Sequence, residues 1–463
     1  MIHDWHKKRS QARAMISGFP PGTVFRGAHV GRLHLVFPQG HGDANLIASG
    51  GQKKLRRKLA IITVLTGLVL GCLAALPLAR EALAEKQGEP ATAYTKFGFK
   101  LFGKLIAEKE QNVFISPASV AFALAMVYNG AAGETQQAMA RTLEIQGLSL
   151  DALNQGNARL RQALGNPDPR IKLNLANSLW LQQGFAFTPG FLKCNEEFYG
   201  ATLEVINFAD PRSSAAINAW VAKATTGKIT GIVDKIEPPL LLINAIYFKG
   251  LWAKPFDKAL TKELPFTLLD GRQKRAPMMS QAGNYQYYRG KNFQAVSLPY
   301  GEKGRFSMKI FLPDQDSSLK EFLRELNAAN WQRWLADFHK TPGSIVLPRF
   351  KLEYEASLTE PLKAMGMEVA FDINKANFAH LDPTPPGVYI GEVKHKTLVE
   401  VNEEGTEAAA VTAVHMPLAS MAPMQEFTMV VDRPFFVAID DSETGVQLFL
   451  GAVVEPKVND PNQ

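Results

Sequence analysis

The hydrophobic pattern of this 463-residue chain has two parts, an uncharged run near the N-terminus and a long mixed region after it. The run is Leu59–Ala79. Beyond residue 91, apolar residues recur at helical spacing over Tyr94–Glu108 and over Ser119–Ala131. Ser116 followed by Pro117 is typical of an N-cap and a first helical residue. The mixed region is therefore predicted to open with two helices.

Strand-like runs follow, and several of them are apolar on both faces, which is typical of strands covered on both sides. The runs are Lys172–Leu181, Leu240–Phe248, Ala295–Leu298, Phe306–Leu312, Ser344–Leu347, Thr397–Val401, Glu426–Val431, Phe435–Ile439 and Gln447–Val454. Turn residues at Asp440–Gly445 predict that the last two form a hairpin. No internal repeat or break divides residues 91–456, so we predict one α+β domain in which helices cover interior strands.

The run Leu59–Ala79 follows a basic cluster at 53–58 and precedes the small residues of Ala82-Leu83-Ala84. This order is typical of a secretory signal peptide. About twenty apolar residues are also enough for one uncleaved membrane anchor. Both alternatives leave the basic flank inside and export the rest of the chain, either secreted or periplasmic. Cys72 adds lipidation as a third alternative, although Leu70 is bulky for such a processing motif.

The positive charge of the chain belongs to its N-terminal tail. The formal net charge is +7, but residues 1–58 hold 11 basic and 2 acidic residues, and the remainder holds 40 and 42. This distribution argues against a nucleic-acid partner. We expect a basic tail at 1–58 that is disordered or an over-extended start, a signal peptide or anchor at 59–84, and a single domain at 85–463.

The sequence contains no common catalytic or metal-binding motif. It has no G-x-S-x-G elbow, no H-E-x-x-H pair and no phosphate-binding loop. The histidines within residues 1–50 have no common ligand spacing, and Cys194 is the single cysteine of the body, which predicts a packing residue and no disulfide. We therefore expect no enzyme activity, no metal and no cofactor.

The most unusual segment is 403–414, with the sequence EEGTEAAAVTAV. Its alanines favour a helix by propensity, whereas Gly405 and several β-branched residues argue against one. As a strand, one face would be uncharged, with Thr406, Ala408, Ala410, Thr412 and Val414. Such a segment can be solvated as a loop or enter a sheet without burying a charge. We expect Glu403 and Glu404, which precede it, to be exposed.

This segment resembles the hinge and reactive-centre loop of inhibitory serpins, and the resemblance extends over residues 91–456. Other blocks that resemble the family, in its order, are Asn112–Ser119, Ala176–Trp180, Asn218–Val221, Thr226–Ile229, Leu242–Gly250, Met278–Met279, Lys394–Lys396, Glu400–Ala410, Asp432–Phe436 and Phe449–Gly451. The resemblance implies the serpin fold, with three β-sheets, about eight to nine helices and an exposed loop. It also implies a monomer that inhibits serine proteases.

In that family a protease attacks the loop, and the hinge then inserts into the central sheet while the protease is still covalently attached. The resemblance implies a hinge at Glu404, Gly405, Thr406, Glu407, Ala408, Ala409 and Ala410. The reactive bond, fourteen residues after Gly405, is Ala419–Ser420, with the neighbouring bond at Leu418 or Ser420 left open. Small apolar residues around it predict an elastase-like or subtilisin-like target protease.

The family pattern also assigns two clusters that would control insertion. Ser116, Ser119, Asn244 and His395 match the "shutter" beneath the sheet, although they would also satisfy one another's hydrogen bonds in a purely structural role. Trp252 matches the "breach", where insertion begins, with simple packing as the alternative. No dense basic face appears in residues 130–170, so we predict no polyanion cofactor. The alternative function is that of a non-inhibitory serpin, such as a carrier, chaperone or storage protein.

Overall fold

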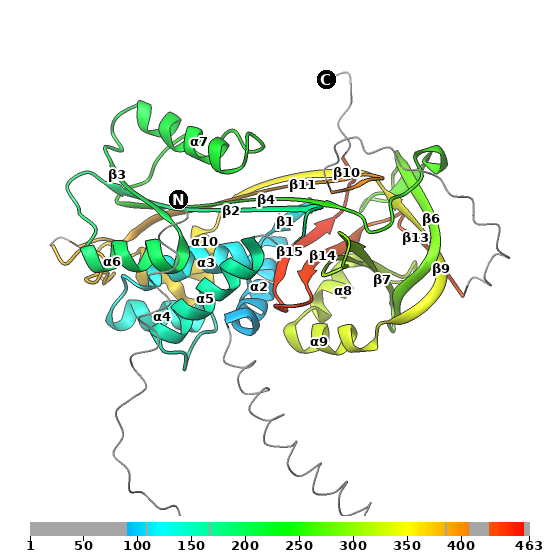
Figure 1. Ribbon diagram of the computed structural model, residues 1–463, viewed down its shortest axis with the longest axis horizontal. Helices are drawn as coiled ribbons and strands as arrows, with labels where there is room; N and C mark the ends of the chain where they lie inside the picture. The colour runs from blue at the N-terminus through cyan, green and yellow to red at the C-terminus, as the bar shows by residue number, and fades with distance from the viewer. Residues whose placement is uncertain (1–89, 108–109, 166–167, 385–386, 407–425, 458–463) are drawn as a thin grey trace, which may run out of the picture. The chain divides into compact units, whose positions relative to one another are not determined.

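The computed structural model describes residues 90–107, 110–165, 168–384, 387–406 and 426–457 (Figure 1). The chain divides into two units, residues 1–75 and 76–463, and every described residue lies in the second. No helix among the described residues is long and apolar enough to cross a membrane. The apolar run Leu59–Ala79 and Cys72 lie outside the described residues.

Nine α-helices occur within the described residues. They are α2 (Pro90–Ala107), α3 (Pro117–Tyr128), α4 (Gly133–Thr142), α5 (Leu150–Gly165), α6 (Pro189–Cys194), α7 (Arg212–Ala224), α8 (Leu319–Glu325), α9 (Ala328–Asp337) and α10 (Thr359–Leu362). All twelve residues of α3 are buried, as expected for a helix that is apolar all round. Its N-cap is Ser116, whose hydroxyl accepts from the Ser119 amide, and Pro117 begins the helix. The predicted start of this helix is confirmed.

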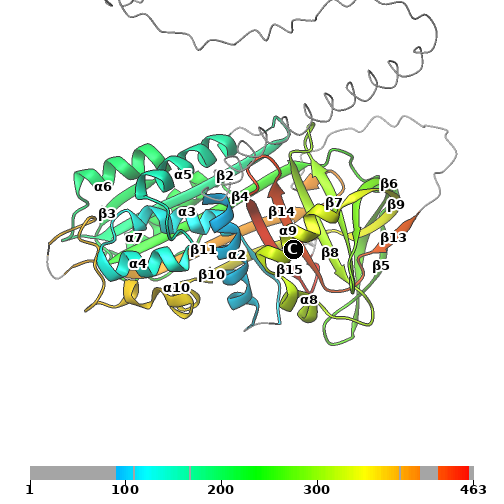
Figure 2. The same ribbon diagram turned by 90° about the horizontal axis from the view of Figure 1, so that it is seen from below.

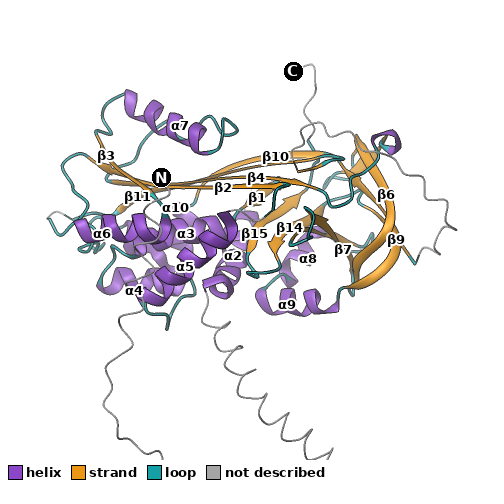
Figure 3. Cartoon of the chain, viewed as in Figure 1, coloured by secondary structure: helices purple, strands orange, loops and turns teal. Residues whose placement is uncertain are grey.

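A six-stranded sheet, the central sheet below, runs through the middle of the domain (Figure 1). Its order is β10 (Phe350–Ser357), β11 (Ile390–Val401), β12 (Gly405–Thr406), β4 (Leu240–Leu251), β2 (Ile171–Gln182) and β3 (Thr202–Ile206). Helices α2 to α6 lie on one side of this sheet and α7 on the other (Figures 2 and 3). Because β4 is covered on both faces, nearly all its residues are buried, as its apolar sequence predicted.

The other strands form a nine-stranded network. It follows the order β1 (Val113–Ile115), β15 (Gln447–Val453), β14 (Phe435–Asp441), β8 (Phe306–Pro313), β7 (Phe293–Tyr300), β6 (Gln273–Arg289), β9 (His339–Pro348) and β13 (Phe427–Val430), and β5 (Lys262–Thr267) also pairs with β6. Strand β6 joins two regions, since Met278–Tyr287 pairs with β9 and Gln286–Arg289 pairs with β7. With the central sheet, these make three sheet regions, as predicted.

The central sheet separates two hydrophobic cores. The larger contains α2, α3 and the strands of the nine-stranded network. The smaller lies under α7, where Ile217 and Val221 pack over Leu241 and Ile243 of β4. Trp220 of α7 meets Trp180 of β2 edge to face, with 6.1 Å between the ring centroids. Both faces of β4 are therefore shielded from solvent, and a segment that entered the sheet beside it would be buried.

Candidate functional site

The site begins where β4 and β11 diverge. These two strands pair in parallel from Ile390 with Leu240 to Leu398 with Tyr247, and we call this boundary the seam. Beyond it, β12 lies between them, antiparallel to both: Thr406 pairs with Val401 of β11, and Gly405 pairs with Leu251 of β4. Gly405 and Thr406 thus form the start of a strand between β4 and β11.

Gly405 is required where β12 approaches β4. A Cβ atom at this position would lie 2.1 Å from the carbonyl oxygen of Gly250 and 2.7 Å from the Cα of Leu251. Its φ of 152° is also one that residues with a side chain rarely adopt. The turn before it is closed by a hydrogen bond from the backbone N–H of Asn402 to the Gly405 carbonyl, over 2.8 Å. Any other residue at 405 would push β12 away from the sheet.

Trp252 contacts the turn that leads into β12. Its ring is almost completely buried and stacks on Tyr300, with centroids 4.3 Å apart and planes 11° from parallel. Its indole N–H donates to the Asn402 carbonyl over 2.9 Å, and its backbone N–H donates to the Glu404 carbonyl over 2.9 Å. The Tyr300 and Thr406 hydroxyls are hydrogen bonded at 2.7 Å, and Thr406 is fully buried. Burial raises the pKa of Tyr300 well above its usual value.

The expectation that Glu403 and Glu404 are exposed is wrong. Glu403 is only 2% exposed, because Arg349 donates from Nε to its Oε1 over 2.7 Å and Thr261 donates to the same oxygen over 2.5 Å. Burial by itself would raise the pKa of Glu403, but these donors outweigh it and lower the pKa. The side chain of Glu404 is 12% exposed and pairs with Lys258 at 2.5 Å. The local sequence could not show that side chains from distant parts of the chain would cover these two glutamates.

The four predicted shutter residues meet at the middle of the seam, and all four are fully buried. His395 of β11 is the register partner of Asn244 of β4, and its Nδ1 lies 2.5 Å from Asn244 Oδ1. On the other side of the histidine ring, Nε2 accepts the backbone N–H of Ser116 over 3.1 Å. Asn244 in turn donates to the hydroxyl of Ser119. The cluster therefore links both strands of the seam to the start of α3.

The hydrogen bonds fix the protonation of His395. Since Nε2 accepts from a backbone N–H, it carries no proton, and Nδ1 must be the nitrogen that donates to Asn244. Burial lowers the pKa of His395 from 6.5 to about 3, against a smaller opposing contribution from Asn244. A neutral imidazole is thus the form that this site holds.

Asn177 of β2 completes the cluster, and we had not singled it out within the block Ala176–Trp180. It is the register partner of Asn244, which donates to its Oδ1 over 2.5 Å. Asn177, Asn244 and His395 therefore form a line of side chains across three adjacent strands. Tyr300, Arg349 and Thr261 were also missed, because no local pattern connects them to the segment they contact.

Part of the predicted site lies outside the described residues. Of the hinge, Glu404, Gly405 and Thr406 are described, while Glu407, Ala408, Ala409 and Ala410 are not. The predicted reactive bond Ala419–Ser420 is also outside. The chain is described again from Glu426, and β13 pairs with β9 of the other network. Residues 407–425, called the bait segment below, are thus preceded by a strand of one sheet and followed by a strand of the other.

Known proteins show the same architecture. The family model described as "Serpin (serine protease inhibitor)" matches residues 92–456. The leukocyte elastase inhibitor of Xenopus laevis is 36% identical over 381 residues, which make up 79% of this chain and 99% of that protein. The native structure of the thermophilic serpin tengpin is 33% identical with a TM-score of 0.74, and the match covers 79% of this chain and 94% of tengpin.

Human thyroxine-binding globulin, solved in complex with thyroxine, is 25% identical with a TM-score of 0.72 over 80% of this chain and 99% of that chain. The chain therefore belongs to the serpin family of serine protease inhibitors. The predicted family and fold class are confirmed.

Proposed function

We propose that this protein traps a serine protease covalently, by inserting its cleaved bait segment into the central sheet. The observation that carries the proposal is β12. Gly405 and Thr406 already pair with β4 and β11, while the seam below is still closed. In the native state the strand between β4 and β11 has therefore begun at Gly405 and Thr406, and it could be extended along the seam.

In the first step the protease serine attacks the carbonyl carbon of Ala419. Its Oγ forms an ester there, the bond to the nitrogen of Ser420 breaks, and the protease's own base transfers the hydroxyl proton to that nitrogen. The segment from Glu407 to Ala419 is then attached to the body only through Thr406. It can enter the seam before water hydrolyses the ester.

The segment 407–419 is long enough to fill the seam between β4 and β11. The segment 407–419 has thirteen residues and would span about 43 Å as an extended strand. Strand β11 has 12 residues, or about 40 Å. An inserted strand would therefore run the full length of β11 and carry the attached protease to the far end of the sheet. Each new backbone hydrogen bond contributes about 1 kcal/mol, net of the bonds to water that it replaces.

The residues around the bond indicate the class of target. No Lys or Arg occurs between Thr406 and Asp432, whereas trypsin-like proteases require one at the cleaved bond. Small apolar residues fit elastase-like or subtilisin-like proteases, and a relative of this chain is named a leukocyte elastase inhibitor. We further propose that the body acts outside the membrane, released by signal cleavage or anchored by residues 59–79.

The alternative is a non-inhibitory serpin, and the complex of thyroxine-binding globulin with thyroxine shows a ligand carrier on the same fold. The uncharged face that starts at Thr406 favours insertion and hence inhibition. The test mixes residues 85–463 with pancreatic elastase or subtilisin on a denaturing gel. A band at the summed mass, with the released peptide beginning at Ser420, is expected. Complete cleavage of the loop with every protease of a serine-protease panel, and no such band, would support the alternative.

A further inference from the structure

The exposed side of α2 carries a row of lysines that the trapping mechanism does not use. Lys96, Lys100 and Lys104 are four residues apart, so they lie within an arc of about 80° on the helix. All three are exposed, and α2 contains no acidic residue. Like charges at this spacing destabilise a helix slightly. Helix stability therefore gives no reason for the row.

Only one lysine of the row is neutralised within the described residues. Lys100 pairs with Glu144, which follows α4. Lys96 and Lys104 have no carboxylate within ion-pairing distance among the residues that the structure describes. The next charged residues in the sequence, Glu108 and Lys109, are of opposite sign. Lys96 and Lys104 are thus exposed and unpaired as far as residues 90–107 and the other described ranges show.

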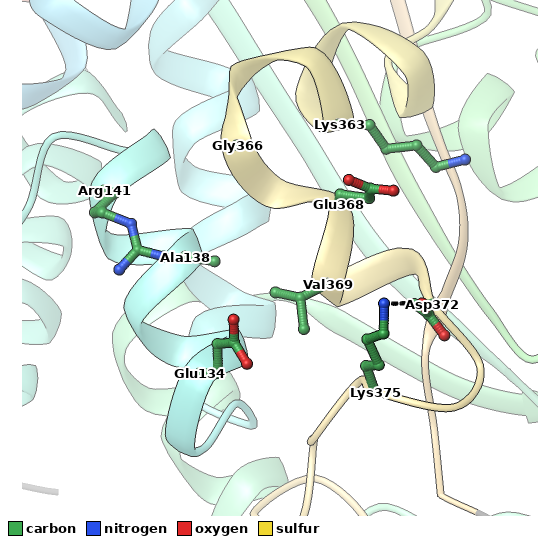
Figure 4. A pocket seen from close by; sticks show the side chains of 9 residues that line it. All are labelled: Glu134, Ala138, Arg141, Lys363, Gly366, Glu368, Val369, Asp372 and Lys375. Atoms are coloured by element: carbon green, nitrogen blue, oxygen red, sulfur yellow. Dashed lines mark ion pairs between the residues drawn. The ribbon is translucent and has the colours of Figure 1, made fainter.

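The surface beside α4, whose following residue Glu144 pairs with Lys100, is not itself basic. A pocket of about 250 Å³ lies between α4 and the turns at Lys363–Met367 and Glu368–Phe371 (Figure 4). Its charged lining residues are three acids and three bases, namely Glu134, Glu368, Asp372, Arg141, Lys363 and Lys375. Lys375 pairs with Asp372 at 3.3 Å. This pocket therefore adds no net positive charge to that of α2.

The sequence places this helix next to the predicted membrane segment. Only the ten residues 80–89 separate Leu59–Ala79 from Pro90, the first residue of α2. Fully extended, they reach at most about 40 Å. Helix α2, with 18 residues, is about 27 Å long, so the whole lysine row is within reach of the bilayer surface.

We propose that the lysine row of α2 docks on the anionic surface of the membrane that residues 59–79 enter. The proposal rests on the membrane-targeting part of the proposed function and is independent of the trapping mechanism. A tether this short holds the row at a high effective concentration near the lipid, so a weak attraction is enough. Each lysine near an anionic surface contributes roughly a five-fold gain in binding.

Docking through α2 leaves the inhibitory site accessible. Strand β13, where the bait segment rejoins the body, lies away from α2 in both views (Figures 1 and 2). The seam between β4 and β11 is buried within the domain and does not include α2. A body lying on lipid through α2 could therefore still offer its bait segment to a protease.

The test uses residues 85–463, which leave out the apolar run Leu59–Ala79. This body is expected to fold alone, because relatives matched over 99% of their own length correspond to only 79% of this chain. Sedimentation compares vesicles of phosphatidylcholine with vesicles that also contain phosphatidylglycerol. We expect binding only to the anionic vesicles, loss of binding at high salt, and at least a roughly 25-fold loss in the double variant Lys96→Glu, Lys104→Glu.

The matched control is the double variant Lys262→Glu, Lys340→Glu, which changes the net charge equally on the exposed positions of β5 and β9. It should keep the binding of the unchanged body. Equal loss in both double variants would contradict the proposal, as would the absence of any preference for anionic vesicles. Retention of the body on an immobilised polyanion, without any binding to vesicles, would also contradict the proposal. Thermal unfolding of each variant confirms that the body remains folded.

Discussion

His395 of β11 and Asn244 of β4 are hydrogen bonded across the seam, with 2.5 Å between Nδ1 and Oδ1. They are also register partners, so this bond lies where the two strands face each other directly. Neighbouring strands are about 4.8 Å apart, and a strand inserted between them would double that separation. The hydrogen bond cannot survive insertion. It therefore stabilises the closed sheet specifically.

Removing the amide should destabilise the closed state. Asn244→Ala removes a hydrogen-bond partner from His395 and from Ser119, which are both fully buried, and each unpaired buried group costs about 1–3 kcal/mol. We expect the free energy of unfolding in urea to fall by at least about 2 kcal/mol. Asn374→Ala, at an exposed position, is the control and should change it by less than about 0.5 kcal/mol. An equal change in the free energy of unfolding for the two variants would contradict a stabilising role of the shutter residues.

His395 should make stability depend on pH. Its pKa is 6.5 when unfolded and about 3 in the folded protein, so between these values the unfolded chain binds one more proton. Stability is therefore lost as pH falls below about 6.5, by about 1.4 kcal/mol per pH unit from this group. Urea unfolding of His395→Gln should show a shallower dependence in this window and a parallel one above it. Identical slopes for both proteins would contradict the buried neutral imidazole.

Thr406 should decide whether cleavage leads to trapping. Thr406→Arg places a charge where the side chain is now fully buried against Tyr300, and burying it would require a large desolvation free energy. We expect at least a ten-fold smaller yield of covalent complex, with the bond still cleaved. Thr406→Ser keeps the hydroxyl and should behave as the unchanged protein. The measurement is the ratio of complex to cleaved inhibitor on a denaturing gel.

The ion pair of Glu403 with Arg349 should hold the chain next to β12. Glu403→Gln removes the charge from a site that is 2% exposed and leaves Arg349 with a weaker acceptor. We expect a loss of about 1–3 kcal/mol in the free energy of unfolding, reduced by the partial exposure of Arg349. Glu360→Gln, whose side chain is 80% exposed, is the matched control and should have little effect.

Much of the fold could be predicted because its signals are local. The runs around Leu240–Phe248 and Phe306–Leu312 are apolar on both faces, and both became buried strands, β4 and β8. Ser116 with Pro117 marked the start of α3. The predicted strand Glu426–Val431 is shorter in the structure, as β13. The long strand β6 was missed because its first residues are polar and exposed, and its pairing with β9 comes from a distant segment.

The residues of the candidate site also fall into those that local sequence patterns identify and those that only long-range contacts bring together. The hinge composition and the family blocks identified Thr406, Trp252 and the four shutter residues from the sequence. The burial of Glu403 depends on Arg349 and Thr261, which are 54 and 142 residues away in the chain. The contact of Tyr300 with Thr406 spans 106 residues. Such pairs have no spacing rule, so only the folded structure could bring them together.

The most direct test of strand insertion locks the seam. Ala245 and Lys396 are register partners across it, so Ala245→Cys with Lys396→Cys should form a disulfide, in a Cys194→Ser background of residues 85–463. Non-reducing gels would compare the oxidised and the reduced protein with the same protease. We expect the oxidised protein to be cleaved without forming a complex, and we expect reduction to restore the covalent band. An oxidised protein that trapped protease as well as the reduced one would contradict insertion between β4 and β11.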